Sequence, residues 1–213
     1  MKKAIYFLLM FLPLLITFCA LPFLPEQVPA HYNFEGEVDR FGSKYETLIF
    51  PVFTILMGLF MLWMAKIGAK DGEKNEKTVF YTGMGISVWF TVMHCYTLFM
   101  DFKNAANLYD FEFDINQIFC ILLGTGMAVM GCFMPKLKKN SLIGLRTSWS
   151  MKNDITWEKS QLFGGISFII CGALMIVAGL FLEELAAMFV ALGLIVADTV
   201  ICVIYSYKIA KKY

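Results

Sequence analysis

Six long apolar runs take up most of this 213-residue chain, and they decide which solvent it folds in. The runs lie at residues 4–24, 48–65, 79–100, 115–134, 162–182 and 186–207. Each is close to the roughly 20 residues that a helix needs to cross a hydrocarbon core of ~30 Å. A spanning segment must be a helix or part of a closed barrel, and these runs lack the alternating pattern of barrel strands. The sequence therefore predicts an all-α, polytopic membrane bundle of about six transmembrane helices, forming a single integral membrane domain over residues 1–213.

Composition and charge distribution agree with a membrane protein. Hydrophobic residues make up 59% of the chain and charged residues 16%, whereas a soluble domain of this size needs a more charged surface. Fifteen of the 18 basic residues lie in segments 2–3, 66–78, 135–161 and 208–213. Because cytoplasmic loops carry an excess of Lys and Arg, we predict that these segments and both termini are cytoplasmic. The loops at 25–47 and 101–114, which hold Arg40, Lys44 and Lys103, are then predicted to be extracellular.

The cysteines point to neither disulfides nor a metal. All six fall inside apolar runs, at positions 19, 95, 120, 132, 171 and 202. None lies in an external loop, and no C-x-x-C pair is present. We therefore expect buried thiols, and the sequence predicts no zinc site and no cofactor.

Two ionisable residues lie inside the predicted spans, where such groups are rare and often functional. Asp198 sits near the middle of the sixth run and His94 toward the outer end of the third. Counting 1.5 Å of rise per residue separates them by about 10 Å in depth, so a direct pair is not expected. Two interpretations stay open: satisfied polar groups that help helices choose partners, or parts of a proton or ion pathway.

Small residues mark the expected packing faces of the helices. Gly165, Gly172 and Gly179 recur every seven residues in the fifth run and form one smooth stripe. Gly124 and Ala128 make a small-xxx-small pair in the fourth run. These faces do not tell an intramolecular neighbour from a second subunit, so the oligomeric state stays open.

The predicted extracellular loop at 25–47 is dense in turn formers and aromatic residues. It is therefore expected to be ordered, in the form of a short hairpin. Its single histidine, His31, has carboxylates nearby, but zinc sites normally take cysteines or several histidines. We expect His31 to hydrogen-bond within the loop.

The predicted cytoplasmic loop at 135–161 carries two tryptophans and an arginine, unlike a plain connector. Asn153 can cap a helix that runs into the fifth span, which would place Trp149 and Trp157 at the headgroup level. Two roles stay open for this loop. It could be a brace that seats the fifth helix, with Arg146 on a phosphate or on helix-end carbonyls, or it could be a partner-binding surface.

These two loops resemble a known family. The segment N-S-L-I-G-L-R-T-S-W at 140–149, followed by W-E-K-S at 157–160, is similar to the signature of the SdpI immunity family, N-x-x-x-G-[IL]-R-T-x-W and then W-x-K-[ST]. The segment V-P-A-H-Y-N-F-E-G-E-V-D-R-F-G-S-K at 28–44 resembles the small membrane domain of unknown function found N-terminal to that signature. One departure is visible: the family often has His after the second element, and this chain has Gln161.

The resemblance implies a multi-pass protein of the bacterial cell membrane that gives resistance to a secreted antibacterial peptide toxin. In the best-known system it also implies signalling, in which the membrane protein holds a cytoplasmic transcriptional repressor away from DNA. The resemblance assigns cytoplasmic partner binding to Asn140, Gly144, Arg146, Thr147, Trp149, Trp157 and Lys159. It assigns toxin contact on the extracellular side to His31, Asn33, Gly36, Asp39, Gly42 and Lys44.

Other functional classes have less support. A small-molecule or proton-coupled transporter or channel is the alternative, favoured by His94, Asp198 and the kink expected at Pro13 but opposed by the scarcity of charge in the spans. No H-E-x-x-H, G-x-S-x-G or phosphate-cradling glycine loop is present, so an enzyme is not predicted. The basic residues follow membrane sidedness, which argues against direct nucleic-acid binding. The predicted partners are thus membrane lipids, the peptide toxin and the repressor.

The basic asymmetry makes a topology prediction. On a cysteine-free background, a single cysteine at Glu37 should react with an impermeant maleimide added to intact cells. A cysteine at Lys74 or Lys139 should react only after permeabilisation. Labelling of position 139 from outside would contradict the proposed orientation.

Overall fold

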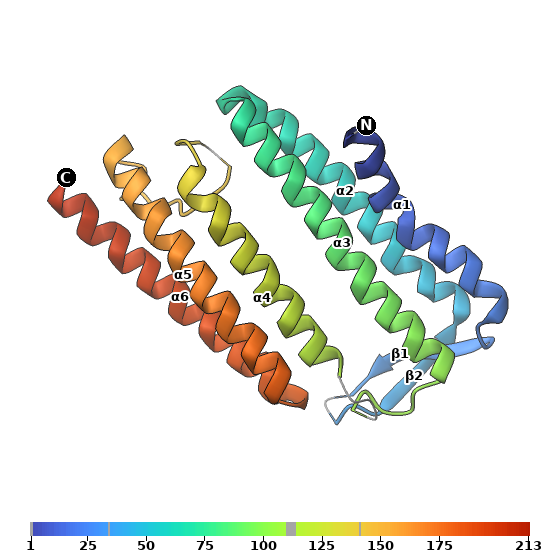
Figure 1. Cartoon of the computed structure of the whole chain (residues 1–213). Coiled ribbons are helices and arrows are strands. Elements are labelled where there is room, and N and C mark those ends of the chain that lie inside the picture. Colours follow the sequence, from blue (N-terminus) through green and yellow to red (C-terminus); the bar gives the residue numbers. More distant parts are fainter. Residues whose placement is uncertain (1, 34, 110–113, 141) are drawn as a thin grey trace. The chain divides into compact units, whose positions relative to one another are not determined.

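The computed structural model of the chain describes residues 2–33, 35–109, 114–140 and 142–213. In this part, six helices are long and apolar enough to cross a membrane, which confirms the predicted polytopic bundle (Figure 1). They are α1 (Lys2–Ala20), α2 (Ile49–Gly68), α3 (Glu73–Lys103), α4 (Ile115–Phe133), α5 (Asp154–Phe181) and α6 (Glu184–Lys212). Two strands, β1 (Gln27–Tyr32) and β2 (Val38–Ser43), form an antiparallel hairpin between α1 and α2. Short 3₁₀ turns are η1 (Leu21–Phe23), η2 (Lys44–Leu48), η3 (Ala69–Asp71) and η4 (Met134–Lys136).

Helix α5 begins well before its apolar run, for a local reason. The Asn153 side chain accepts a hydrogen bond from the Thr156 amide at 2.8 Å, and the Thr156 hydroxyl accepts one from the Asn153 amide at 3.0 Å. This reciprocal capping box satisfies two amides that the helix leaves without intrahelical partners. The prediction that Asn153 caps this helix is confirmed.

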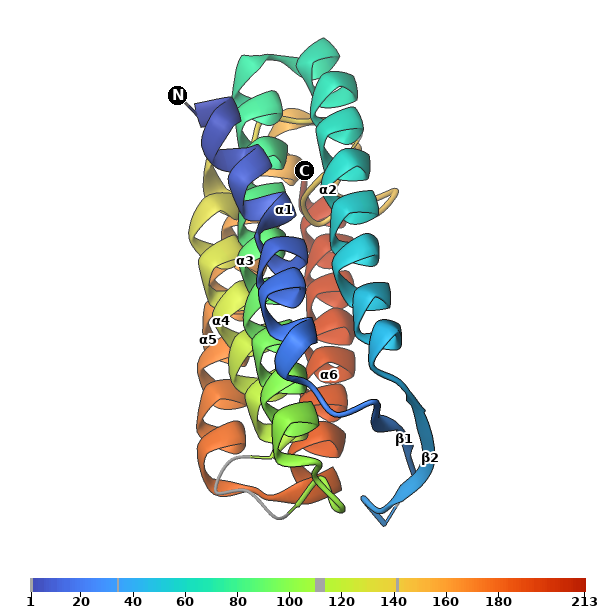
Figure 2. The same cartoon turned by 90° about the vertical axis from the view of Figure 1, so that its right-hand side faces the viewer.

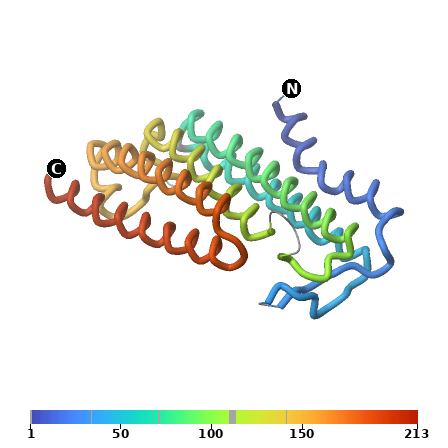
Figure 3. Tube along the Cα trace, turned by 60° about the horizontal axis from the view of Figure 1, so that its bottom comes forward, coloured from blue at the N-terminus to red at the C-terminus, as the bar shows by residue number. Residues whose placement is uncertain are grey.

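The chain divides into two compact units. Unit 1 comprises Met1–Met61 and Gly83–Ile115, and unit 2 comprises Leu62–Thr82 and Asn116–Tyr213. In unit 1 the hairpin lies at the end where α1 stops, α2 starts and α3 stops (Figure 2). In unit 2, α4, α5 and α6 run side by side (Figure 3).

In unit 1, α1 packs against glycines of α2 and α3. The buried Tyr6 hydroxyl donates a hydrogen bond of 2.9 Å to the Gly58 carbonyl of α2. A Cβ atom on Gly58 would lie 2.6 Å from the Met10 sulfur, and one on Gly83 would lie 2.9 Å from Met61 Cβ. The missing side chains of Gly58 and Gly83 thus make room for side chains of the neighbouring helices.

Unit 2 is built on a seam of glycines between α4 and α5. The stripe seen in the sequence of α5 meets α4 residues that share its seven-residue spacing. A Cβ on Gly124 would lie 2.6 Å from the Gly172 carbonyl oxygen, and one on Gly131 would lie 2.5 Å from that of Gly165. At the far end, a Cβ on Gly179 would lie 2.9 Å from the Gln117 carbonyl oxygen. The partner of the stripe is therefore a helix of the same chain, held at the backbone separation that small residues allow.

The cysteines divide into two groups, which corrects the expectation that all six are buried. Cys120, Cys171 and Cys202 are buried in unit 2, and Cys120 contacts α5 and α6 through its sulfur. The other three are free thiols on exposed helix surfaces: Cys19, Cys95 and Cys132. A position inside an apolar run does not tell which face of the helix turns inward.

The glycine seam makes a stability prediction with a matched control on the same helix. Gly124→Ala should destabilise the protein by about 1–3 kcal/mol, the usual cost of overpacking, because its methyl group meets the α5 backbone. Gly126→Ala should have little effect, because nothing lies within 4 Å of a Cβ at that position. Unfolding midpoints in detergent, measured by near-UV circular dichroism, compare the two variants. Equal effects would contradict a close α4–α5 seam.

Candidate functional site

The first candidate surface is the hairpin, which confirms the structure expected for the loop after the first span. Gln27 pairs with Ser43 and Pro29 with Phe41, and bulges interrupt the register on either side of His31. Proline lacks a backbone donor and bulges distort a ladder, so β1 is suited to an edge strand. The hairpin therefore presents its side chains rather than an open backbone edge.

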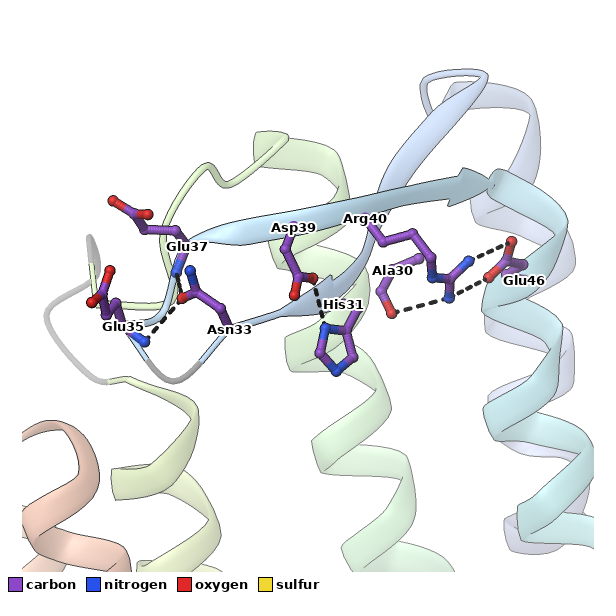
Figure 4. Close-up of polar contacts among 8 residues, drawn as sticks. All are labelled: Ala30, His31, Asn33, Glu35, Glu37, Asp39, Arg40 and Glu46. Atoms are coloured by element: carbon purple, nitrogen blue, oxygen red, sulfur yellow. Dashed lines mark hydrogen bonds and ion pairs between the residues drawn. The ribbon is translucent and has the colours of Figure 1, made fainter.

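Asn33 and Gly36 shape the turn of the hairpin. The Asn33 side-chain oxygen accepts hydrogen bonds from the amides of Glu35 and Glu37, each at 2.9 Å (Figure 4). Gly36 has a φ of +79°, a conformation that side chains rarely adopt, and a Cβ there would lie 2.7 Å from the Asn107 side-chain oxygen. Both residues thus serve the shape of the loop.

The segment after α3 joins the hairpin, a contact that the sequence did not predict. The Val38 amide donates to the Ala106 carbonyl at 3.1 Å, and the Leu108 amide donates to the Gly36 carbonyl at 2.8 Å. The Tyr32 hydroxyl donates to the Ala105 carbonyl at 3.3 Å. Burial and the nearby Asp101 carboxyl raise the pKa of Tyr32 to about 12, so this hydroxyl keeps its proton. The hairpin is therefore anchored to unit 1 by backbone hydrogen bonds.

Three polar side-chain pairs fasten the hairpin. His31 Nδ1 lies 2.6 Å from Asp39 Oδ1, and the two side chains are 64% and 45% exposed (Figure 4). As expected, His31 hydrogen-bonds within the loop.

Two further pairs connect the strands to their flanks. Arg40 pairs with Glu46 at 3.1 Å, and Lys44 pairs with Glu26 at 2.9 Å. Gly42 is buried beneath Glu46, whose carboxylate would meet a Cβ there. Of the residues assigned to this surface, Gly42 and Lys44 thus support the hairpin, while His31 and Asp39 face outward. Among the described residues, no group of three or more His, Cys, Asp or Glu could hold a metal ion.

The second candidate surface is the segment 137–153 between η4 and α5, here called the signature loop. Asn140 organises its start from a buried position. Its side-chain oxygen accepts from the Leu142 and Ile143 amides at 2.8 Å each, and its nitrogen donates to the Lys138 and Ile143 carbonyls at 2.8 and 3.1 Å. Asn140 therefore substitutes for the backbone pairing that an irregular segment lacks.

Gln161 holds the middle of the signature loop against α5. Its side-chain oxygen accepts from the Leu145 amide and its nitrogen donates to the Leu145 carbonyl, both at 2.9 Å. Gly144, with a φ of +103°, lets the chain approach, because a Cβ there would lie 3.0 Å from Gln161 Cδ. This residue occupies the position where the resembled family often has His. The amide group donates and accepts at once without titrating, and no pattern in the sequence indicates this role.

Thr147 ties the signature loop to α6. Its hydroxyl lies 2.9 Å from that of Ser206, and its amide donates to the Ser150 hydroxyl at 2.9 Å. Ser150 in turn donates to the Leu145 carbonyl at 2.8 Å. The neighbouring Trp149 packs edge-on against Tyr207 of α6, with ring centroids 5.1 Å apart. The loop is thus fastened to both α5 and α6.

Trp157 lies inside the protein, which corrects the expectation that its ring meets headgroups. It is 1% exposed, and its indole nitrogen donates to the Leu137 carbonyl at 2.9 Å. Met134 and Leu137 pack around it. A buried Trp needs a partner for its N–H, and the carbonyl of the preceding loop supplies it.

Arg146 differs from these inward-facing residues. Its side chain is exposed, and it forms no hydrogen bond or ion pair with any residue that the structure describes. Trp149 is 37% exposed, and Lys159 has its amine 5.1 Å from the centre of the Tyr213 ring. The signature thus separates into a buried brace and an exposed remainder.

The two intramembrane polar residues both have protein partners. His94 Nε2 lies 2.6 Å from the Thr17 hydroxyl, which also lies 2.8 Å from the Pro13 carbonyl oxygen. Phe50 stacks on the imidazole at a centroid distance of 5.5 Å. Both contacts lie within unit 1.

Asp198 lies between α5 and α6 in unit 2 and is 5% exposed. It accepts hydrogen bonds from the Ser167 hydroxyl and, at 3.9 Å, from the Cys202 thiol. One neutral donor on α5 and one on α6 therefore bond to this carboxyl, which favours a packing role.

These features define a class: a multi-pass helical membrane protein with an ordered hairpin after its first span and a hydrogen-bonded loop before its fifth. A family model described as a domain of unknown function, DUF1648, matches residues 8–55, and the model of the SdpI/YfhL protein family matches residues 136–206. The chain is thus similar to the SdpI/YfhL family over the signature loop, α5 and most of α6, and to the DUF1648 domain over α1, the hairpin and the start of α2.

Two relatives show how far the similarity extends. The Immunity protein SdpI of Bacillus subtilis (strain 168) is 23% identical over 211 residues, which cover 99% of this chain and 97% of the relative. An uncharacterized protein of Archaeoglobus fulgidus is 50% identical over 40 residues, which cover 18% of this chain and 22% of that protein. No solved structure matches the chain. With six candidate spans and a relative matched over nearly its whole length, this is a multi-pass protein of the bacterial membrane.

The hydrogen bonds of the signature loop lead to a prediction that distinguishes Gln161, which faces inward, from the exposed Arg146. Gln161→Leu removes the partner of both Leu145 backbone groups, so amide exchange at Leu145 should accelerate about tenfold or more, given ~1–3 kcal/mol for an unpaired buried group. Hydrogen–deuterium exchange with mass spectrometry measures this in detergent. Arg146→Ala is the control and should leave exchange unchanged. Unaltered exchange in Gln161→Leu would show that the amide does not hold the loop.

Proposed function

We propose that this protein protects the bacterial cell that carries it against a secreted antibacterial peptide toxin, and that it does so by binding rather than by catalysis or transport. The observation that carries the proposal is the similarity over nearly the whole chain to a protein named as an immunity protein. Each of the two matched family regions includes one of the ordered loops together with the helices around it. The two loops carry the exposed polar groups at the helix ends, which supports recognition there.

The hairpin is the proposed toxin contact. The excess of basic residues in the other loops supports its position outside the cell. Its exposed face presents the His31–Asp39 pair with Arg40 beside it, and Phe41 is 51% exposed. Backbone anchoring to the segment after α3 supports a surface that is formed before a ligand arrives, which lowers the entropic cost of binding.

The signature loop is the proposed contact for a cytoplasmic transcriptional repressor. Arg and Trp are the residue types that dominate binding hot spots, and Arg146 and Trp149 are the exposed part of a braced loop. The brace holds them in place through Thr147 and Gln161. Asn140, Gly144 and Trp157 would then act on partner binding indirectly, by shaping the loop.

A transporter or channel has less support. His94 and Asp198 would be its functional groups, and each hydrogen-bonds to a neutral protein partner. A transport pathway would need these groups to exchange protons or ions. The contacts on both residues instead resemble those that select helix partners in membranes.

A toxin-challenge assay tests the proposal and separates it from transport. Expression of the wild-type chain in toxin-sensitive bacteria should raise survival, and Asp198→Asn should protect equally well, because it keeps hydrogen bonding and removes only titration. His31→Ala combined with Asp39→Ala should abolish protection at equal membrane abundance. Lys103→Ala serves as a control for a change of charge elsewhere.

Two outcomes would contradict the proposal. Protection lost in a folded Asp198→Asn variant would favour proton-coupled transport. No protection by the wild-type chain against any tested secreted peptide would remove the immunity function itself.

A further inference from the structure

Six cations gather around the last turns of α6. Three of them belong to α6 itself, contacts bring two more to its end, and the sixth, Arg146, adjoins a residue that contacts α6. The Lys152 amine donates to the Ala210 carbonyl at 2.8 Å, and Thr147, next to Arg146, contacts Ser206. The group, here called the α6-end cluster, consists of Arg146, Lys152, Lys159, Lys208, Lys211 and Lys212.

The α6-end cluster is not neutralised by the protein. None of its six cations forms an ion pair with a carboxylate that the structure describes, although Asp154 and Glu158 lie nearby in the sequence. The contrast with the hairpin is clear, because Arg40 and Lys44 both pair with glutamates there. Six positive charges in one place repel one another, so an external anion would stabilise this end of unit 2.

Aromatic rings lie among these cations. The Lys211 amine is 4.6 Å from the centre of the Tyr207 ring, and the Tyr213 ring is 5.1 Å from the Lys159 amine and 5.6 Å from that of Lys212. Trp149 packs on the same Tyr207. Tyr and Trp with basic side chains at the ends of spanning helices are typical of the zone where lipid headgroups lie.

Apolar side chains continue from the cluster along the helices. Ile155 and Leu162 of α5 are 50% and 53% exposed, and Ile204 of α6 is 48% exposed. A ligand that meets both surfaces needs a charged head and hydrocarbon chains. An acidic soluble protein would match only the cations.

We propose that the α6-end cluster binds the headgroup phosphate of an anionic phospholipid, with Arg146 as a principal contact and the acyl chains along the exposed apolar faces of α5 and α6. A guanidinium can chelate a phosphate through two N–H groups, and Arg146 has no protein partner that would compete. Binding of this kind would hold the signature loop and the end of α6 at the headgroup level. It does not depend on the immunity proposal.

Native mass spectrometry of the full chain in detergent tests this with dioleoyl phosphatidylglycerol and dioleoyl phosphatidylcholine. The wild type should bind the anionic lipid more tightly. Arg146→Ala should weaken phosphatidylglycerol binding about fivefold, which corresponds to about 1 kcal/mol per cation at an anionic surface, and Arg146→Ala with Lys208→Ala should weaken it further. Phosphatidylcholine binding should not change. Lys103→Ala, at the end of α3 in unit 1, is the matched control and should behave as wild type.

Three results would overturn the proposal. Equal affinity of the wild type for the two lipids would show that the cations do not select an anionic lipid, and would favour another partner such as an acidic soluble protein. An equal loss in Lys103→Ala would show that only overall charge matters. Displacement of phosphatidylglycerol by inorganic phosphate at the same concentration would assign the site to a free anion. Because Arg146 forms no hydrogen bond or ion pair with a described residue, its replacement should leave the fold intact and the comparison valid.

Discussion

In hydrocarbon, helices gain no hydrophobic free energy by leaving lipid for one another, so unit 2 depends on how closely α4 and α5 approach. Their glycine seam sets this distance, and it continues to the end of α4, where Met134 meets Gly164. The start of α5 is thereby placed so that Trp157 reaches the Leu137 carbonyl. This bond holds the start of the signature loop, and Gln161 and Thr147 fasten its middle to α5 and α6.

The signature loop contains two kinds of residue that the sequence motif does not distinguish: residues bonded within the protein and residues that are exposed. The side chains of Asn140 and Thr147 form hydrogen bonds with other residues of the protein. Gln161, which lies outside the motif core, does the same. Arg146 does not, and Trp149 shares its ring between Tyr207 and solvent. Rigid support beneath a small exposed group is the arrangement expected of a recognition surface, because little entropy remains to be lost on binding.

The hairpin is likewise a rigidly supported surface, but backbone hydrogen bonds and polar side-chain pairs provide its support. Its position rests on backbone hydrogen bonds to the segment after α3, and its exposed face is held by the His31–Asp39 hydrogen bond and the Arg40–Glu46 ion pair. Exposed ion pairs contribute little stability, so their value lies in presenting defined polar groups. Within the spans, by contrast, His94 and Asp198 form hydrogen bonds with the neutral side chains of Thr17 and Ser167. The exposed polar groups of these two surfaces therefore lie at the helix ends.

The sequence by itself determined the features that depend on local physics. Hydrocarbon thickness and backbone satisfaction define six spans, turn formers predict the hairpin, and Asn153 caps α5 three residues before its bonding partner. Only the tertiary structure decided which helix meets the stripe of Gly172, and that Trp157 is buried while Cys132 is exposed. No sequence pattern predicted the pairing of Gln161 with Leu145. Every residue of an apolar run suits lipid and protein alike, so composition does not show which face turns inward, and contacts between distant segments arise only once the helices have chosen their neighbours.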